Sequence, residues 1–536
     1  MRTDALPAAS AVDLRHAAEP RERPGLLTRR ASLNAGASLL DYGARIGTGL
    51  VITPILVSGL GRSLYGVWEM LLRLGSYVSA TDGRPTEALR LVIAQQQFAD
   101  DAAAKRRVVG AAIAVWMLLL PLMLAAGGVL VWLAPRLTDA GPALRADVRI
   151  ATALLVGSFI ITSLAAVPES VLRGMNLGYR RMGWQANLHV LGGALAAAAI
   201  LTGFGLVGLG LAQLLQWIAT ALCFWFIVRR VVPWFAAARP SRNDIRALFG
   251  MSVWLSAGDV VARVLLASDV IILGAIAGPA LVSTFVLTGY AARVAAGIHV
   301  FTTGAAIPGV GAVLGSGQIE RARQARRELL LLTWLFVTVA GTTILLWNRS
   351  FIGLWVGPQH FAGDAINLLV VLIAVQTAFI RTDSYIIDAA LRPRLRVLIA
   401  GFAAALTIGA SIVLTGMFGL AGLCAGFLAG RAVQSLACPL LARVSLGQPP
   451  HGTGFAHPAG QAWMEAIRLG LVTVLLFAAA TALSGPFALT SWAAWLACVV
   501  ATLVLVSGVA VVAGPGPAGR QRLLQRMRAL RPGRRI

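Results

Sequence analysis

Arginines inside long apolar stretches are the residues of this sequence whose chemistry most needs an explanation. A guanidinium group is permanently charged and offers a planar fork of donors that suits phosphate or carboxylate. An arginine at the centre of a bilayer costs about 2.5–3.5 kcal/mol on insertion scales, so it must reach an interface, pair with an acid or line a hydrated cavity. The arginines in this position are Arg45, Arg73, Arg84, Arg90, Arg263, Arg293, Arg381 and Arg431.

Two of these arginines follow an aspartate by four residues. Asp41 precedes Arg45, and Asp259 precedes Arg263. Residues with this spacing lie on the same face of a helix and can pair. Two interpretations stay open for each pair: a structural ion pair that neutralises itself, or an arginine that faces a ligand.

A third group of charges lies in the apolar segment 362–390, where Arg381 precedes Asp388 by seven residues and Asp383 lies between them. Buried carboxylates and imidazoles can titrate near neutral pH. For His299, a hydrogen-bonded buried imidazole is the simpler interpretation. The candidates for ion pairing or proton coupling are Asp41, Asp259, Asp269, Asp82, Asp383, Asp388 and His299.

The pairs proposed above include neither Arg73 nor Arg293. We therefore expect these two residues to face an anionic ligand. Arg90 and Arg431 are close to helix ends, from which a long side chain reaches the membrane interface. No grouping with metal-ligand spacing accompanies them, so no metal or cofactor is expected. The candidate substrate-binding residues are Arg45, Arg73, Arg263, Arg293, Arg84 and Arg381.

The composition shows which elements must position these side chains. Of the 536 residues, 58% are hydrophobic and 13% are charged, with a mean hydropathy of +0.77. A soluble chain has roughly 45–50% apolar and about 25% charged residues, so we predict an all-α polytopic membrane protein. About fourteen runs have the roughly 20 residues that a spanning helix needs: 34–58, 64–97, 108–133, 148–172, 184–202, 205–228, 249–277, 280–313, 328–348, 362–390, 397–416, 419–442, 463–484 and 489–513.

The basic residues orient these spans. With fourteen spans, most arginines fall on the termini and the loops of one side, and the net charge is +24. The positive-inside rule then places both termini in the cytoplasm. Because the charge is spread over many short loops that face anionic lipid headgroups, nucleic acid is not expected as a partner. The basic residues on the opposite side are Arg62, Arg136, Arg145, Arg149 and Arg349.

The Asp-x-x-x-Arg pair that occurs in both halves of the chain suggests a duplicated six-helix unit. Repeated halves are typical of alternating-access transporters, so we expect a site between them, lined by spans 1, 2, 7 and 8. We predict two pseudo-symmetric six-helix lobes and two C-terminal helices. The segments are a polar tail (1–33), an N-lobe (34–230), a link (231–248), a C-lobe (249–443), a linker with spans 13 and 14 (444–513), and a basic amphipathic tail (514–536).

Nothing in the sequence has the pattern of a catalytic site. There is no Ser/His/Asp order, no Cys/His pair and no glycine-rich phosphate loop. The longest outward loop, near 134–147, is too short to carry a catalytic domain. We therefore expect a protein that is not an enzyme.

The stretch from Asn34 to Gln97 resembles the opening of bacterial polysaccharide-unit flippases of the O-antigen type. These belong to the multidrug/oligosaccharidyl-lipid/polysaccharide (MOP) exporter superfamily. Arg84-Pro85 departs from the smoother Asp-x-Gly continuation of that family. The features that carry the resemblance are the initial asparagine, Pro54, the turn Leu60-Gly61-Arg62-Ser63-Leu64-Tyr65-Gly66-Val67-Trp68, the pair Asp82-Gly83 and the exit Ala94-Gln95-Gln96-Gln97.

The resemblance implies flipping of an undecaprenyl-pyrophosphate-linked oligosaccharide for surface polysaccharide biosynthesis, with cavity arginines holding the diphosphate. It also implies a glycan polymerase or glycosyltransferases as partners, and we expect a monomer. The alternative is a cation-coupled multidrug or small-molecule exporter of the same superfamily, which would favour an acidic, aromatic cavity. A membrane enzyme and a non-transporting membrane scaffold are two further alternatives.

Overall fold

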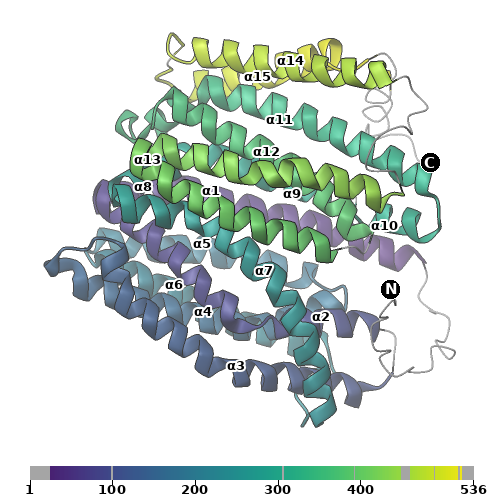
Figure 1. Ribbon diagram of the computed structural model, residues 1–536. Helices are drawn as coiled ribbons and strands as arrows, with labels where there is room; N and C mark the ends of the chain where they lie inside the picture. Colours follow the sequence, from purple (N-terminus) through teal and green to yellow (C-terminus); the bar gives the residue numbers. More distant parts are fainter. Residues whose placement is uncertain are drawn as a thin grey trace.

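The computed structural model describes residues 24–97, 100–304, 307–390, 393–447, 459–487, 489–516 and 520–521, so most of the two predicted tails lies outside the described residues. The described chain is helical throughout (Figure 1). Its helices are α1 (Pro24–Val78), α2 (Pro85–Gln95), α3 (Ala102–Leu137), α4 (Arg145–Gly174), α5 (Tyr179–Leu201), α6 (Gly205–Val231), α7 (Arg242–Ala277), α8 (Pro279–Thr288), α9 (Tyr290–Gly304), α10 (Ile307–Gly315), α11 (Ile319–Trp355), α12 (Asp364–Ala389), α13 (Pro393–Ser445), α14 (Ala459–Leu483) and α15 (Trp492–Ala513), with short 3-10 turns η2 (Ser79–Asp82), η3 (Pro142–Leu144) and η4 (Pro358–His360).

Eleven stretches of the described residues are helical, long and apolar enough to cross a membrane. The all-helical, multi-pass class is therefore confirmed, but the span count differs from fourteen. Two predicted spans lie in α13, and α1 holds the first predicted span and the beginning of the second, because these helices change direction at Gly61 and Gly419, whose φ angles of 71° and 56° suit glycine. The rest of the second predicted span forms η2 and α2. The span predicted at 280–313 is divided among α8, α9 and α10, and α7 covers the seventh predicted span. Fourteen crossings stay a prediction.

Small residues hold the two arms of α13 together. A Cβ atom on Gly426 would lie 2.6 Å from the Cα atom of Ser411, and one on Gly430 would lie 2.3 Å from the Cα atom of Thr407. Such close backbone approach is how helices associate in a membrane, where burial away from water supplies no driving force. The two arms lie side by side as a hairpin (Figure 1).

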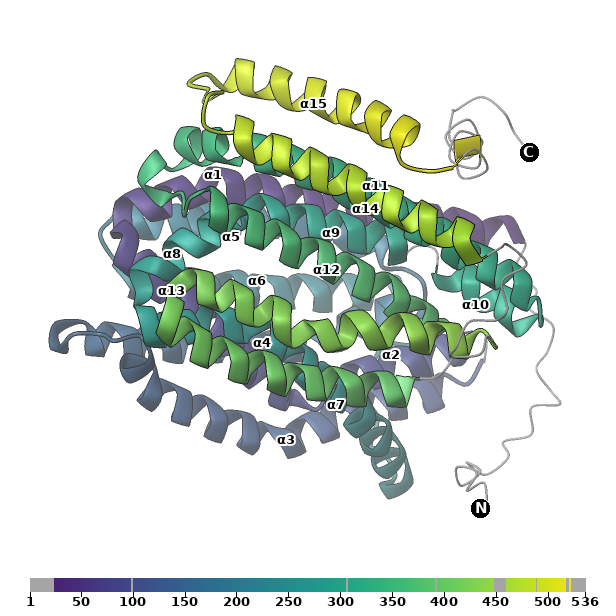
Figure 2. The same cartoon turned by 45° about the horizontal axis from the view of Figure 1, so that its top comes forward.

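Hydrogen bonds join the basic loops at one end of the bundle. Asn34 donates to Asn176 at 2.7 Å, and Arg106 donates to the carbonyl of Trp234 at 2.9 Å. The beginning of α1 and the end of α15 both lie at this end (Figures 1 and 2). We call it the inner end, and the opposite end, where Gly61 lies, the outer end. The side of the membrane that each end faces stays a prediction.

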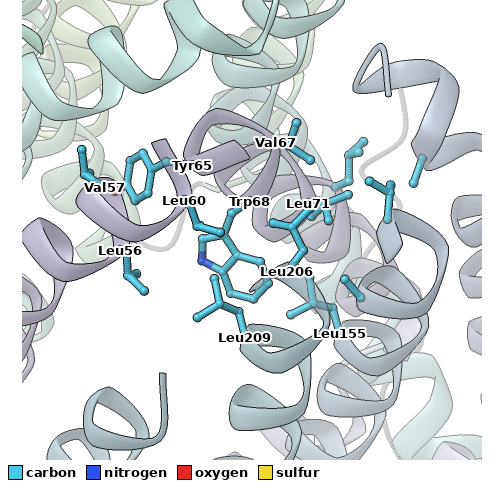
Figure 3. Close-up of a cluster of buried hydrophobic side chains, with 14 of the residues drawn as sticks. Leu56, Val57, Leu60, Tyr65, Val67, Trp68, Leu71, Leu155, Leu206 and Leu209 are labelled. Atoms are coloured by element: carbon cyan, nitrogen blue, oxygen red, sulfur yellow. The ribbon is translucent and has the colours of Figure 1, made fainter. Parts of the chain in front are cut away.

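A hydrophobic cluster fixes α1 against the helices of the first half. Trp68 and Leu71, on the arm of α1 that follows Gly61, pack with Leu155 of α4 and with Leu206 and Leu209 of α6 (Figure 3). We call the part of α1 after Gly61 the second arm. Its buried face is thereby held by the first half, which leaves another face of the same arm for contact with the second half.

Candidate functional site

The second arm of α1 packs antiparallel against α7 and the start of α8, and so forms a seam between the two halves. A Cβ atom on Gly66 would lie 1.8 Å from the carbonyl oxygen of Pro279. A Cβ atom on Gly274 would lie 2.2 Å from Sδ of Met70. The two glycines therefore allow the helices to touch along the outer part of the seam.

Five polar residues lie along or beside this seam, and their charges influence one another. Tyr65, Glu69 and Arg73 come from the second arm of α1, Asp269 comes from α7, and Arg293 comes from α9. The Tyr65 hydroxyl donates to Oε1 of Glu69 at 2.9 Å. The guanidinium of Arg293 interacts electrostatically with Arg73, Glu69 and Asp269. We call these five residues the central cluster.

The central cluster lies deep in the bundle and yet is accessible. Arg73 follows Gly61 by twelve residues, which is about 18 Å along a helix and near the middle of a hydrocarbon core of about 30 Å. Arg293 is exposed, and Glu69, Arg73 and Asp269 are half-buried. Charged side chains at this depth need water or mutual compensation. The cluster is thus a set of charged and polar side chains, one of them exposed, at the contact between the two halves.

The cluster contains two guanidinium groups and two carboxylates, so its formal charges balance. This differs from the predicted surplus of unpartnered arginine. Glu69 stands four residues before Arg73 and so shares its helix face, a relation that the sequence analysis overlooked. Asp269 compensates from a different helix, since both Arg73 and Arg293 act on its carboxylate.

Backbone groups hold two members of the cluster in place. Arg293 donates through Nη2 to the carbonyl of Val286. The amide of Val270 donates to Oδ1 of Asp269 at 2.7 Å. Fixed side chains of this kind present a preformed set of charges to a ligand.

Arg45 and Asp41 lie nearer the inner end of α1. Asp41 is 3.4 Å from Nε2 of His189 on α5, while the exposed Arg45 stacks over the ring of Tyr42 at 5.6 Å. Tyr42 in turn donates to the carbonyl of Val294 on α9 at 2.9 Å. The predicted Asp41–Arg45 relation is therefore replaced by a contact between α1 and α5, because the nearest partner comes from a neighbouring helix.

Arg263, Arg84 and Asp82 lie around the end of the second arm of α1. Arg263 donates through Nη1 to the hydroxyl of Ser79, and so joins α7 to η2. Asp82 accepts from the backbone N–H of Arg84 at 2.9 Å, and Arg84 adopts a left-handed conformation with φ of 53°. The unusual Arg84-Pro85 step thus forms a turn before α2. The side chain of Asp259 lies outside the described residues.

The acids predicted to accompany Arg381 have other partners. Asp383 is 2.7 Å from Nη2 of Arg326 on α11. Asp388 is 2.8 Å from Nε of Arg396 on α13. Arg381 itself is half-buried and still interacts electrostatically with Asp388. These ion pairs join helices of the second half, and the structure does not bring Arg381 into the central cluster.

His299 is a buried imidazole with a hydrogen bond. Its Nε2 lies 3.1 Å from the hydroxyl of Thr333, which lies 2.9 Å from that of Thr382. Within the described ranges, no group of three or more His, Cys, Asp or Glu residues could hold a metal ion. This arrangement agrees with the simpler interpretation of His299, a hydrogen-bonded buried imidazole.

The comparisons with known proteins relate the chain to one family and one fold. Residues 94–311 match the family described as polysaccharide biosynthesis protein. No curated protein sequence matches the chain significantly. Among solved structures, the lipid II flippase MurJ in an inward closed conformation is similar over 92% of this chain and 99% of that chain, with a TM-score of 0.66 and 13% identity.

Two multidrug transporter structures are also similar. A multidrug resistance MATE family transporter of the MOP superfamily, in an inward-facing conformation, aligns with a TM-score of 0.63 and 16% identity over 76% of this chain and 98% of that chain. A MATE structure in complex with MaD5 has a TM-score of 0.56 and 16% identity over 78% of this chain and 96% of that chain. At these identities the likeness shows a shared fold.

Proposed function

We propose that this chain, which has the fold of the MOP transporter superfamily and matches the polysaccharide biosynthesis protein family over residues 94–311, is a flippase for a lipid-linked oligosaccharide. The observation that carries this proposal is that Arg73 and Arg293 lie near enough to each other at the seam between the two halves for their charges to interact. One arginine comes from each half, so a ligand held by both would join the halves.

The chemistry of the cluster fits the diphosphate of such a cargo. Each guanidinium offers parallel donors to phosphate oxygens. Tyr65 and Glu69 add a hydroxyl and acceptor oxygens that suit sugar hydroxyls. In the proposed cycle the two halves rock about the seam, the diphosphate stays on Arg73 and Arg293, and the lipid tail remains in the bilayer. No covalent bond changes.

The proposal places the protein in a bacterial inner membrane with both termini in the cytoplasm. The basic loops joined at the inner end support this orientation through the positive-inside rule. The direction of transport would then be from the inner to the outer leaflet. Anionic lipids, and a glycan polymerase or glycosyltransferase, are the expected partners of a monomeric protein.

Flipping of a fluorescent undecaprenyl-pyrophosphate-linked oligosaccharide in proteoliposomes tests the proposal. Replacing Arg73 and Arg293 together by Gln should lower the rate by at least about tenfold, because a hydrogen bond to a charged group contributes roughly 1.5–3 kcal/mol. The matched control is Arg136→Gln, since Arg136 is an exposed arginine that stacks on Trp132 at 4.4 Å, away from the seam. Equal flipping by the double variant and the control would refute the proposal.

A second candidate function is favoured by the carboxylates of the cluster. Glu69 and Asp269 are the type of residue that a cation-coupled multidrug or small-molecule exporter uses to hold a cationic drug or a coupling ion. In that case Glu69→Gln with Asp269→Asn would abolish transport of ethidium, while Arg73→Gln would not. Ethidium transport by the unmodified protein is the measurement that separates the two candidates.

A further inference from the structure

A pocket lies at the outer end of the molecule, and none of the residues of the central cluster lines it. It has a volume of about 590 Å³, within the roughly 300–1,000 Å³ of typical small-molecule sites. One wall is the end of the first arm of α1, and the other is the end of α11 with η4, so the pocket spans both halves. The residues that matter for its chemistry are Ser58, Gly61, Arg62, Trp355, Gln359 and His360.

The pocket has a buried floor and an exposed polar rim. Trp355 and His360 on the floor are only 7% and 5% exposed. Ser58, Arg62 and Gln359 on the rim are exposed. An apolar, aromatic floor with a few polar groups above it is the usual design of a site for a small organic molecule.

Two glycines with left-handed backbone shape the walls. Gly61 has φ of 71° and Gly357 has φ of 102°, a region that side chains rarely adopt. A Cβ atom on Gly357 would also lie 2.6 Å from the amide of Gln359. The glycine therefore allows the Gln359 side chain to fold against the backbone at the rim.

The polar lining consists of hydrogen-bond donors and neutral groups. Arg62 donates through Nε and Nη2 to the hydroxyl of Thr284, at 3.0 and 2.5 Å, which leaves donors on Nη1 for a ligand. Nδ1 of His360 has no hydrogen-bond partner among the described residues. Burial and the charge of Arg62 lower the pKa of His360, so its imidazole is neutral at pH 7. No carboxylate is among the described residues that line the pocket.

We propose that this pocket binds an acidic sugar residue of the transported glycan, with the sugar carboxylate on Arg62. The proposal rests on the flippase function, since a glycan head that leaves the central cluster must pass the outer end of the seam. Gln359 and Ser58 offer hydrogen bonds to sugar hydroxyls, and the ring packs above Trp355. Because the two walls belong to different halves, a bound sugar joins them.

Binding of free monosaccharides to the full chain in nanodiscs tests this site without any transport step. The probes are D-glucuronate and D-glucose, whose dissociation constants come from titration by saturation-transfer NMR of their C–H protons, with inorganic phosphate added as a competitor. Glucuronate should bind more tightly than glucose. Arg62→Gln should weaken glucuronate binding about tenfold, the loss expected for one hydrogen bond to a charged group, whereas the matched outer-end control Arg136→Gln should bind as the unmodified protein does.

Gln359→Ala supplies a second variant in case loss of the Arg62–Thr284 contact disturbs the seam. It should weaken glucuronate and glucose alike, because it removes an amide that both sugars use. Unchanged glucuronate binding by both variants would overturn the proposal. Loss of the glucuronate signal at a phosphate concentration close to the dissociation constant of glucuronate would also overturn it, and would indicate a site for lipid headgroups. If Arg73 and Arg293 prove essential for flipping while Arg62→Gln binds glucuronate normally, the flippase function stands and the sugar site fails.

Discussion

Gly66 allows the contact between the two halves to be tested by the addition of one methyl group. A Cβ atom added at this position would lie 1.8 Å from the carbonyl oxygen of Pro279, a backbone atom at the start of α8. A carbon and a carbonyl oxygen in contact stand about 3.3 Å apart, so Gly66→Ala must separate the helices by roughly 1.5 Å. At Gly274 the neighbour is the thioether of Met70, which can rotate away.

The neighbour of the added methyl group is a backbone atom at Gly66 and a flexible side chain at Gly274, and this difference determines how far each substitution opens the seam. Forcing an extra methyl group into a packed site costs about 1–3 kcal/mol. If the cost falls only on the conformation in which the outer seam is closed, the population of the open conformation rises by roughly 5–150-fold. We expect the full effect for Gly66→Ala and a smaller one for Gly274→Ala.

Labelling of a buried cysteine measures the opening. Ser283 on α8 is 0% exposed, so Ser283→Cys, in a background without the native cysteines, should react slowly with a membrane-impermeant maleimide. Gly66→Ala should speed this reaction, and Gly47→Ala should not, because a Cβ atom on Gly47 has nothing within 4 Å. Equal labelling rates in the two variants, with unchanged thermal unfolding, would refute the reasoning.

Three further predictions concern stability. Arg326→Ala should lower the free energy of unfolding by about 3–5 kcal/mol, because it leaves the 3%-exposed Asp383 as a buried charge without its partner. Thermal unfolding in detergent measures this change. Replacing both residues by Leu should restore most of the lost stability. Hydrogen bonds from the backbone N–H and hydroxyl of Ser241 lower the pKa of Asp244 at the start of α7, so this cap stabilises the helix above about pH 4 and is lost as the pH falls through the lowered pKa. Hydrogen exchange in the first turn of α7 should rise there, and Asp244→Asn should show no such step. Gly426→Ala should separate the arms of α13 at a cost of about 1–3 kcal/mol, seen as a lower unfolding midpoint.

Sequence reasoning located the helices of the site because it rests on local rules. Polar residues in apolar runs must face a partner or a cavity, and this rule singled out Arg73 and Arg293, whose charges act on each other in the folded chain. The turn at Gly61 was likewise visible as a glycine between two apolar runs. The length of a span and the free-energy cost of placing a charged residue in the bilayer are properties of a single helix. The sequence alone therefore suffices to estimate both.

The partners of the acids could not be found in this way. Arg326 and Asp383 are separated by 57 positions, and Asp41 meets His189 on another helix. Such contacts depend on how each helix is rotated and shifted against its neighbour, which spacing along one helix does not record. The outer pocket was missed for the same reason, because Arg62 and His360 come together only when the two halves pack.

The balanced charge of the central cluster bears on how a carrier returns after it releases an anion. Two guanidinium groups alone in a low-dielectric site would repel each other and resist any movement that removes water. Glu69 and Asp269 lie close enough to compensate them when no ligand is bound. A diphosphate offers more acceptor oxygens in a geometry that fits the guanidinium fork, so it can compete with the carboxylates for the same N–H donors. The acids therefore lower the cost of the empty state, and the arginines provide the affinity of the loaded state.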